Sequence, residues 1–199
     1  MTNILRITAA LLFVANAFAA TTWKIDTDHS IANFKIKHLV VSNVTGSVSF
    51  TGGQFEIDEK DFTKTKMEGT LDPKTINTSN EKRDGHLKSA DFFDVAKNPT
   101  IKFVSKKIEA DGAKYRVTGD LTLHGVTKAI TLFCEKPTDP IKAFGGQHRG
   151  FSATGKINRK DFGMVWNKAL ETGGLAVGEE LEVSIDLELA HTEAPSKKT

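Results

Sequence analysis

The fold is decided by the stretch Leu-Glu-Val-Ser-Ile-Asp-Leu-Glu-Leu at residues 181–189. Apolar residues occupy its odd-numbered positions and polar residues its even-numbered positions, a period of two that places one face of a β-strand against a core. Shorter alternating runs recur along the chain, without the regular strand–helix alternation of a parallel sheet. We therefore predict an all-β fold, an eight-stranded antiparallel up-and-down barrel with one short mid-chain helix.

Two local signals refine this prediction. The pair Gly52-Gly53 separates two alternating runs and predicts the turn of a β-hairpin. Thr78 and Glu81 have the spacing of a capping box, with Thr78 as the N-cap, and predict a helix that reaches about Leu87.

The N-terminus predicts export. Arg6 precedes a short apolar run at 7–14, and Ala17-Phe18-Ala19 places small residues where a signal peptidase reads them. The apolar run is shorter than the ~20 residues that a membrane-spanning helix needs, so we expect a cleaved signal rather than an anchor. We divide the chain into a signal peptide (1–19), a barrel (20–192) and a flexible tail (193–199), and no membrane-spanning segment is expected.

Charge and cysteine content narrow the function classes. The chain has 27 Lys and Arg against 25 Asp and Glu, a net charge of +2, and so lacks the strongly basic character of a nucleic-acid-binding domain. Cys134 is the single cysteine, which excludes an internal disulfide in an exported protein. Because it shares an alternation face with Ile130 and Leu132, we expect a buried, unreactive side chain.

No sequence motif for catalysis is present. The chain has no G-x-S-x-G elbow, phosphate-binding glycine loop or H-E-x-x-H pair. Asp28-His29-Ser30 contains the residue types of a catalytic triad, but neighbours on a strand point to opposite faces, so we expect local hydrogen bonds there instead of a relay. The six histidines are not spaced as metal ligands, and we predict neither a metal nor a cofactor.

The predicted interior leaves two possibilities open. Eight strands enclose either a packed core or one small ligand. Small residues at inward positions favour a cavity: Gly46, Gly69, Gly119, Cys134, Ala153 and Gly155. His38 shares the inward face of Phe34 and Ile36, and is either a satisfied core histidine or a contact for a ligand head group at the mouth.

One turn near the C-terminal strand also has a structural interpretation. Arg159, Asp161 and Gly163 predict a structural turn. Phe162 and Trp166 are expected to pack inward beside it or to shape a rim.

Four motifs, in order, resemble those of the YceI family of periplasmic polyisoprenoid-binding proteins. They are Trp23-Lys24-Ile25-Asp26 with His29-Ser30, Arg83-Asp84-Gly85-His86-Leu87 with Asp91-Phe92-Phe93-Asp94, the run from Gly119 to Lys128, and the run from Asn158 to Met164. The resemblance covers nearly all of the chain after the signal. It implies a lipocalin-like barrel with an apolar tunnel, a bound isoprenoid chain such as a prenylated quinone or polyprenyl lipid, or another long-chain amphiphile, and a periplasmic location. It allows a homodimer and does not imply catalysis.

The predicted function is therefore periplasmic binding, transport or storage of a long-chain isoprenoid lipid. The predicted ligand-binding residues are Phe34, Ile36, His38, Val48, Phe50, Phe55, Leu71, Phe103, Leu121, Leu123, Phe151, Trp166, Val183 and Ile185. Two alternatives stay open: an enzyme that acts on an apolar amphiphile, and a stress-response module with a filled core.

Overall fold

The computed structural model describes residues 20–171 and 173–192. The predicted signal peptide (1–19) and tail (193–199) lie outside the described residues, and both stay predictions.

Eight long strands close into an antiparallel barrel, as predicted. The elements are β1 (Thr21–His38), β2 (Ser42–Ile57), η1 (Phe62–Lys64), β3 (Lys66–Asn77), α1 (Glu81–Lys88), β4 (Ile101–Asp111), β5 (Lys114–Leu123), β6 (Val126–Cys134), β7 (Ile141–Ala143), β8 (Gly146–Asn158), η2 (Arg159–Phe162) and β9 (Val177–His191). The sheet order is β6-β5-β4-β3-β2-β1-β9-β8-β7, and a further pairing of β6 with β8 closes the ring. Strand β7 has only three residues and pairs with β8 outside that ring.

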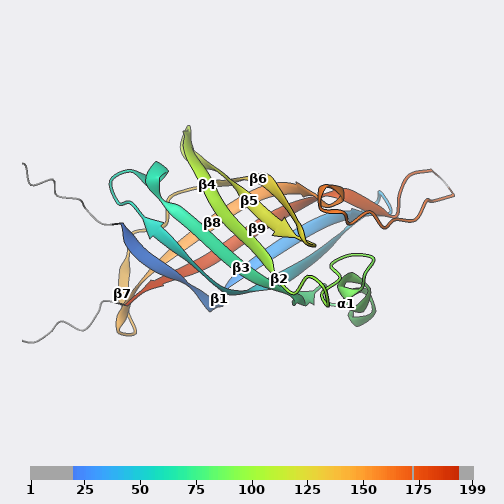
Figure 1. Cartoon of the computed structure of the whole chain (residues 1–199), viewed down its shortest axis with the longest axis horizontal. Coiled ribbons are helices and arrows are strands. Elements are labelled where there is room, and N and C mark those ends of the chain that lie inside the picture. The colour runs from blue at the N-terminus through green and yellow to red at the C-terminus, as the bar shows by residue number, and fades with distance from the viewer. Residues whose placement is uncertain (1–19, 172, 193–199) are drawn as a thin grey trace, which may run out of the picture.

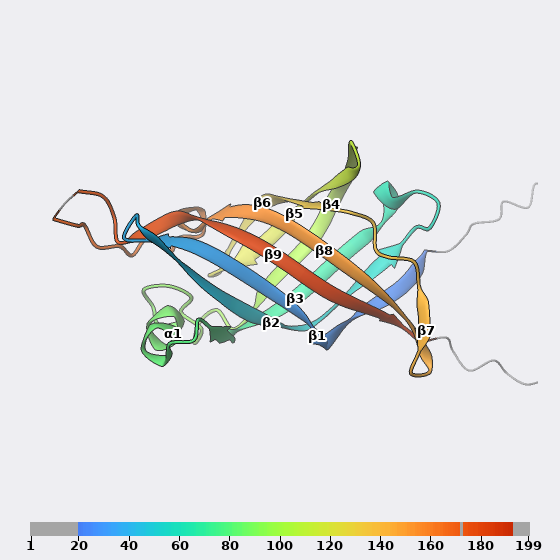
Figure 2. The ribbon, with the colours of Figure 1, turned by 180° about the vertical axis from the view of Figure 1, so that it is seen from behind.

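The barrel is elongated, and its two ends differ (Figure 1). Helix α1 lies at one end, close to the loop that joins β8 to β9. Strand β7 lies at the other end, where β1 begins and β9 finishes, as the view from behind also shows (Figure 2). The single mid-chain helix is confirmed.

The predicted hairpin at Gly52-Gly53 is wrong. Strand β2 runs through both glycines without turning, and its register against β3 shifts between Phe50 and Gly52. The extra residue is Thr51, which forms a bulge next to the glycines, and their positive backbone φ angles also fit a turn. A side chain at Gly53 would overlap the carbonyl oxygen of Glu68 on β3, so the close approach of two strands requires glycine there.

The predicted helix is present, but its cap is displaced by two residues. Asn80 is the N-cap, and its side chain accepts the backbone N–H of Arg83 at 2.9 Å. Ser79 has a φ of +59°, which adds a turn between Thr78 and the helix. The Thr78 hydroxyl instead donates to the Asp84 carboxylate and accepts from Arg83 Nε at 2.7 Å.

The β7 end of the barrel is plugged. Trp23 is 2 % exposed and packs under the Arg149 guanidinium, whose carbon lies 4.9 Å from the ring centroid. Glu59 receives hydrogen bonds from both terminal nitrogens of Arg149, at 2.8 and 3.0 Å. Phe62 of η1 meets the Tyr115 ring edge-on at 4.8 Å. The interior therefore opens toward α1 and not toward β7.

Candidate functional site

An apolar cavity of about 160 Å³ lies inside the barrel. Its walls carry Ile, Leu, Val and Phe side chains from β1, β2, β3, β4, β5, β6, β8 and β9, and the polar residues that border it are Asn33 and Glu68. None of the five plug residues lines it. The cavity is large compared with the ~10–15 Å³ that holds one water, so this interior is not a filled core.

A second cavity, of about 210 Å³, forms the mouth beneath α1. Leu87 and Phe92 cover it from the helical side, and Met164 and Trp166 line it from the β8–β9 loop. Trp166 is fixed by ring contacts with His86 at 4.8 Å and with Phe92 at 5.3 Å.

Three side chains line both cavities and separate them: Phe34, Phe93 and Leu181. Together the two cavities extend from the α1 end toward the plug. We call the two adjoining cavities the tunnel; its passage is interrupted by these three side chains, and its mouth is at the α1 end.

Every predicted ligand-binding residue lines one of these cavities. Val48, Phe50, Phe55, Leu71, Phe103, Leu121, Leu123, Phe151, Val183 and Ile185 line the barrel cavity; Ile36, His38 and Trp166 line the mouth; and Phe34 lines both. Whether they bind a ligand stays a prediction.

Several lining residues are not among those predicted from the sequence. Ala32 and Ile130 lie on predicted strands and were recognisable from alternation alone. Phe93 follows α1 in an irregular segment, where no periodicity marks which side chain turns inward. Arg159 lines the mouth from the turn at the end of β8, where its residue type suggested only a structural role.

Small inward residues do not create the cavity in the way that the sequence suggested. A side chain at Gly46 would lie 2.6 Å from the ring of Phe34, and one at Gly119 would lie 2.5 Å from the ring of Phe103. Aromatic rings on neighbouring strands therefore cover these glycines and fill the space that they leave. The inference from small residues to free volume is wrong at these positions.

Incomplete burial of inward side chains is the better sign of the cavity. Ala32, Phe34, Phe103, Val183 and Ile185 line the barrel cavity, yet each is only partly buried. Inward side chains of a close-packed core would be fully covered.

The predicted turn at the end of β8 is a 3-10 turn that ends at Gly163, with a φ of +78°. Arg159 is 2 % exposed. Its Nε donates to the Gly178 carbonyl at 2.8 Å, and its Nη1 donates to the Met164 carbonyl. Burial lowers the pKa of this guanidinium, and the nearby charge of Glu179 opposes the shift.

Asp28-His29-Ser30 does not form a relay. Ser30 accepts the backbone N–H of Glu188 at 3.1 Å, whereas His29 points to solvent and lies 3.2 Å from the Asp26 carboxylate. The pKa of the His29 imidazole is raised. The largest cause is its hydrogen bond to the Asp26 carboxylate, and the next is Coulombic attraction to the same carboxylate. Ligand atoms of Asp26, His29 and Glu188 lie within 4.8 Å of one another, but none of the three lines either cavity.

Cys134 is 3 % exposed, as expected of a buried apolar residue. Burial, with a smaller contribution from the charge of Glu135, raises the pKa of its thiol to about 12. A thiol in this state is a poor nucleophile at neutral pH.

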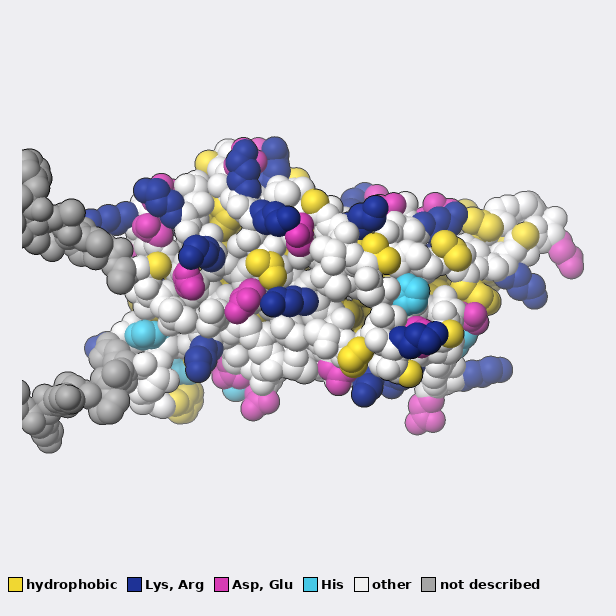
Figure 3. Space-filling view, in the orientation of Figure 1, with side chains coloured by type: hydrophobic (Ala, Val, Ile, Leu, Met, Phe, Trp, Pro, Cys, Tyr) yellow, Lys and Arg dark blue, Asp and Glu magenta, His cyan; other side chains and the backbone are white. Residues whose placement is uncertain are grey.

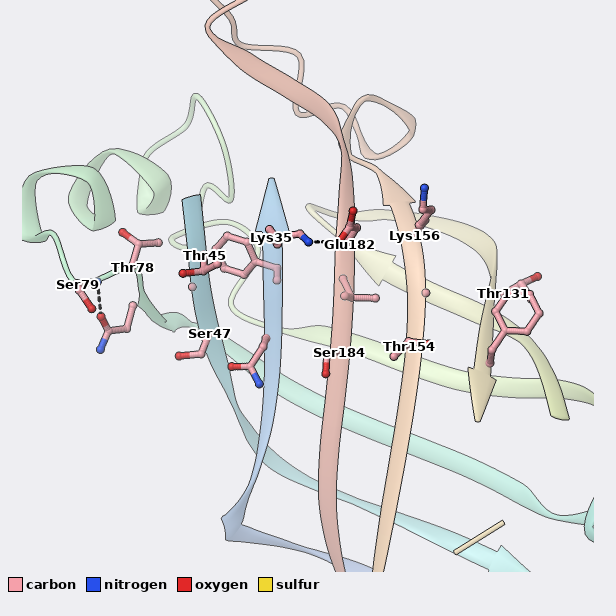
Figure 4. A pocket seen from close by; sticks show the side chains of 17 residues that line it. Lys35, Thr45, Ser47, Thr78, Ser79, Thr131, Thr154, Lys156, Glu182 and Ser184 are labelled. Atoms are coloured by element: carbon pink, nitrogen blue, oxygen red, sulfur yellow. Dashed lines mark hydrogen bonds and ion pairs between the residues drawn. The ribbon is translucent and has the colours of Figure 1, made fainter. Parts of the chain in front are cut away.

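A larger hollow, of about 1140 Å³, lies on the surface across β2, β1, β9, β8 and β6 (Figure 4). Hydroxyl side chains line it, and an ion pair between Lys35 and Glu182 crosses its middle. Charged side chains of both signs are interspersed over the face drawn in Figure 3. The barrel cavity has a more apolar lining than this hollow, so the tunnel is the better candidate site for an apolar chain.

Among the described residues, no helix has the length and apolar character needed to cross a membrane.

Comparison with known proteins agrees with this geometry. Residues 23–189 match the family model described as the YceI-like domain. Protein YceI of Escherichia coli O157:H7 is 40 % identical over 156 residues, which cover 77 % of this chain and 82 % of that protein. The crystal structure of the Campylobacter jejuni YCEI protein aligns with a TM-score of 0.64 at 33 % identity, covering 79 % of this chain and 90 % of that one. A polyisoprenoid binding domain from Saccharophagus degradans shares the fold, with a TM-score of 0.56 at 16 % identity over 88 % of this chain and 99 % of that one. The chain belongs to the YceI family.

Proposed function

We propose that this protein binds a long-chain isoprenoid lipid, of the polyprenyl or prenylated quinone type, inside the barrel and without catalysis. We further propose that it is exported to the periplasm by the N-terminal signal and transports or stores the lipid there. The observation that carries the proposal is the single-mouthed apolar tunnel, formed by the two adjoining cavities. The polyisoprenoid binding domain of Saccharophagus degradans, which has the same fold, supports this class of ligand.

The volumes indicate how much chain the tunnel holds before it adjusts. Taking each carbon as roughly the ~30 Å³ of a water molecule, a five-carbon isoprene unit needs about 150 Å³. The barrel cavity of about 160 Å³ therefore matches one unit, and the mouth of about 210 Å³ matches slightly more. A longer chain requires the separating side chains, Phe34, Phe93 and Leu181, to change rotamer.

Burial supplies the driving force. Each CH₂ group transferred from water contributes about 0.8 kcal/mol, so one isoprene unit contributes roughly 4 kcal/mol before ordering costs are subtracted. Two units alone would place the gross gain near the free energy of micromolar binding. An apolar lining is sufficient for this, and no specific polar contact to the tail is needed.

The lining also supports a binding role over an enzymatic one. Of the two polar residues that line the barrel cavity, Glu68 lies 3.9 Å from Lys102 and is 42 % exposed. The other, Asn33, has no ionisable group. The barrel cavity therefore offers no buried acid or base for chemistry on the tail.

Native mass spectrometry of the protein purified from its periplasm, followed by organic extraction, tests the proposal. We expect a stoichiometric mass increment that is identified as a prenyl quinone or polyprenyl lipid. A clean apo mass that is unchanged after incubation with isoprenoid lipids would refute lipid binding.

A further inference from the structure

Arg159 is buried at the mouth with part of its hydrogen-bonding capacity unused. Two of its nitrogens donate to backbone carbonyls, as described above. Nη2 is also buried, and no hydrogen-bond partner for it exists among the described residues. A buried donor without a partner is costly, and more so when it carries charge. Support of the turn explains the hydrogen bonds of Nε and Nη1, but it does not explain why Nη2 is buried without a partner.

No described carboxylate compensates the charge of Arg159 at close range, although its guanidinium carbon lies 6.0 Å from the centroid of the Phe92 ring. Among the described residues, no carboxylate lies within ion-pair distance of it, and the nearby Glu179 pairs with Lys160. Arg149 at the plugged end differs in this respect. Its Nε also lacks a hydrogen-bond partner among the described residues, but both of its terminal nitrogens donate to the Glu59 carboxylate. A buried charge is normally paired, so the unpaired one needs an explanation.

The mouth as a whole is cationic. Lys37, Arg83 and Arg159 line it, and no Asp or Glu is among its lining residues. Arg83 is held in place by donating from Nε and Nη2 to the hydroxyl and carbonyl of Thr78. His38 adds a further polar group to the same lining.

We propose that displacement of the side chains that cover Nη2 of Arg159 lets this nitrogen donate a charge-assisted hydrogen bond to an oxyanion head group, a phosphate or a carboxylate, that is held in the mouth at the end of an apolar chain. This inference rests on the proposed function and specifies its orientation. The charged head stays beneath α1, and the tail passes Phe34 and Phe93 toward the plug. Pairing with the oxyanion supplies both the missing acceptor and the missing countercharge.

Ligands that share one chain and differ in the head group test the wild-type protein directly. Geranylgeranyl phosphate, geranylgeranoic acid and geranylgeraniol are titrated in parallel, with a prenylated quinone as the neutral carbonyl. We expect the phosphate, the carboxylate or both to bind about tenfold or more tightly than the alcohol, as a hydrogen bond to a charged group implies. The difference between the phosphate and the acid identifies the preferred oxyanion.

Variants locate the effect. Arg159→Gln is expected to abolish the preference for the oxyanion, so that the ratio of the affinities for the oxyanion ligand and the alcohol falls to about one. Lys160→Gln, which alters the neighbouring surface lysine, is the matched control and is expected to keep the preference. If Arg159→Gln does not fold, the guanidinium ¹⁵N resonances of wild-type Arg159 serve instead: they should shift on addition of the preferred oxyanion ligand but not of the alcohol.

The outcomes separate this inference from the proposed function. Equal affinity for all head groups, with unchanged Arg159 resonances, would overturn the head-group site and leave lipid binding intact. Binding of none of the ligands, including the alcohol, would overturn both.

Discussion

Filling the barrel cavity from its wall should weaken ligand binding without weakening the fold. Ala32 on β1 faces the cavity yet is only partly buried, so added atoms would enter free space. Ala32→Leu adds three carbons, or about 90 Å³ at ~30 Å³ each, which is more than half of the 160 Å³ available. Displacing about two to three CH₂ groups of the ligand costs roughly 2 kcal/mol, or about thirtyfold in Kd. The free protein gains apolar contacts, and its Tm should stay unchanged or rise.

The assay pairs lipid titration with thermal unfolding of the ligand-free protein. Thr45→Leu places the same side chain at an exposed position on β2 and serves as the control. We expect wild-type affinity from the control and reduced affinity from Ala32→Leu. A folded Ala32→Leu variant with wild-type affinity would show that the tail does not occupy this cavity. A large drop in Tm would show that the space beside Ala32 is not free.

Three further predictions concern the packing around the tunnel. Gly119→Ala would place its Cβ 2.5 Å from the Phe103 ring, so we expect a loss of about 1–3 kcal/mol in urea unfolding; an unchanged midpoint would contradict this packing. Because its pKa is raised to about 12, Cys134 should react with a thiol reagent at pH 8 only when the protein unfolds; rapid stoichiometric labelling of the native protein would show that the thiol is accessible. Glu59→Ala leaves Arg149 buried without its carboxylate and should lower the free energy of unfolding by about 1–3 kcal/mol. This figure is smaller than for a fully buried pair because the Glu59 side chain is 51 % exposed. A wild-type unfolding midpoint would show that the plug does not depend on this pair.

The sequence predicted the barrel because strand alternation is a local property. A strand with one buried face must alternate apolar and polar residues, and the run 181–189 does so. Strand β9 contains this run. Gly52-Gly53 was misread because a turn and a bulge both use positive φ angles, and only the partner strand distinguishes them. The displaced helix cap has a similar cause, since Thr78 had the expected spacing but hydrogen-bonds to side chains of the helix instead of capping it.

The site was predictable only in part. Tunnel residues on strands followed from alternation, as for Val183 and Ile185. The free volume between them did not, because it depends on how rings such as Phe34 lie over glycines on the next strand. The unpaired Nη2 of Arg159 had no sequence signal either, because whether an arginine finds a carboxylate depends on three-dimensional distances.

The two ends of the barrel explain why a ligand would have a fixed direction. At the β7 end, the buried guanidinium of Arg149 is neutralised by Glu59 and covered by Trp23, so the protein itself completes the contacts that a charged group needs. At the α1 end, Arg159 is as deeply buried but lacks a carboxylate, and no residue of α1 is fully buried. A chain with an apolar tail and an anionic head would leave an uncompensated charge if it entered head-first, because the guanidinium of the plug is already paired with Glu59. Entering tail-first, it places apolar carbon against the apolar walls and its charge beside Arg159, which is the orientation that both ends favour.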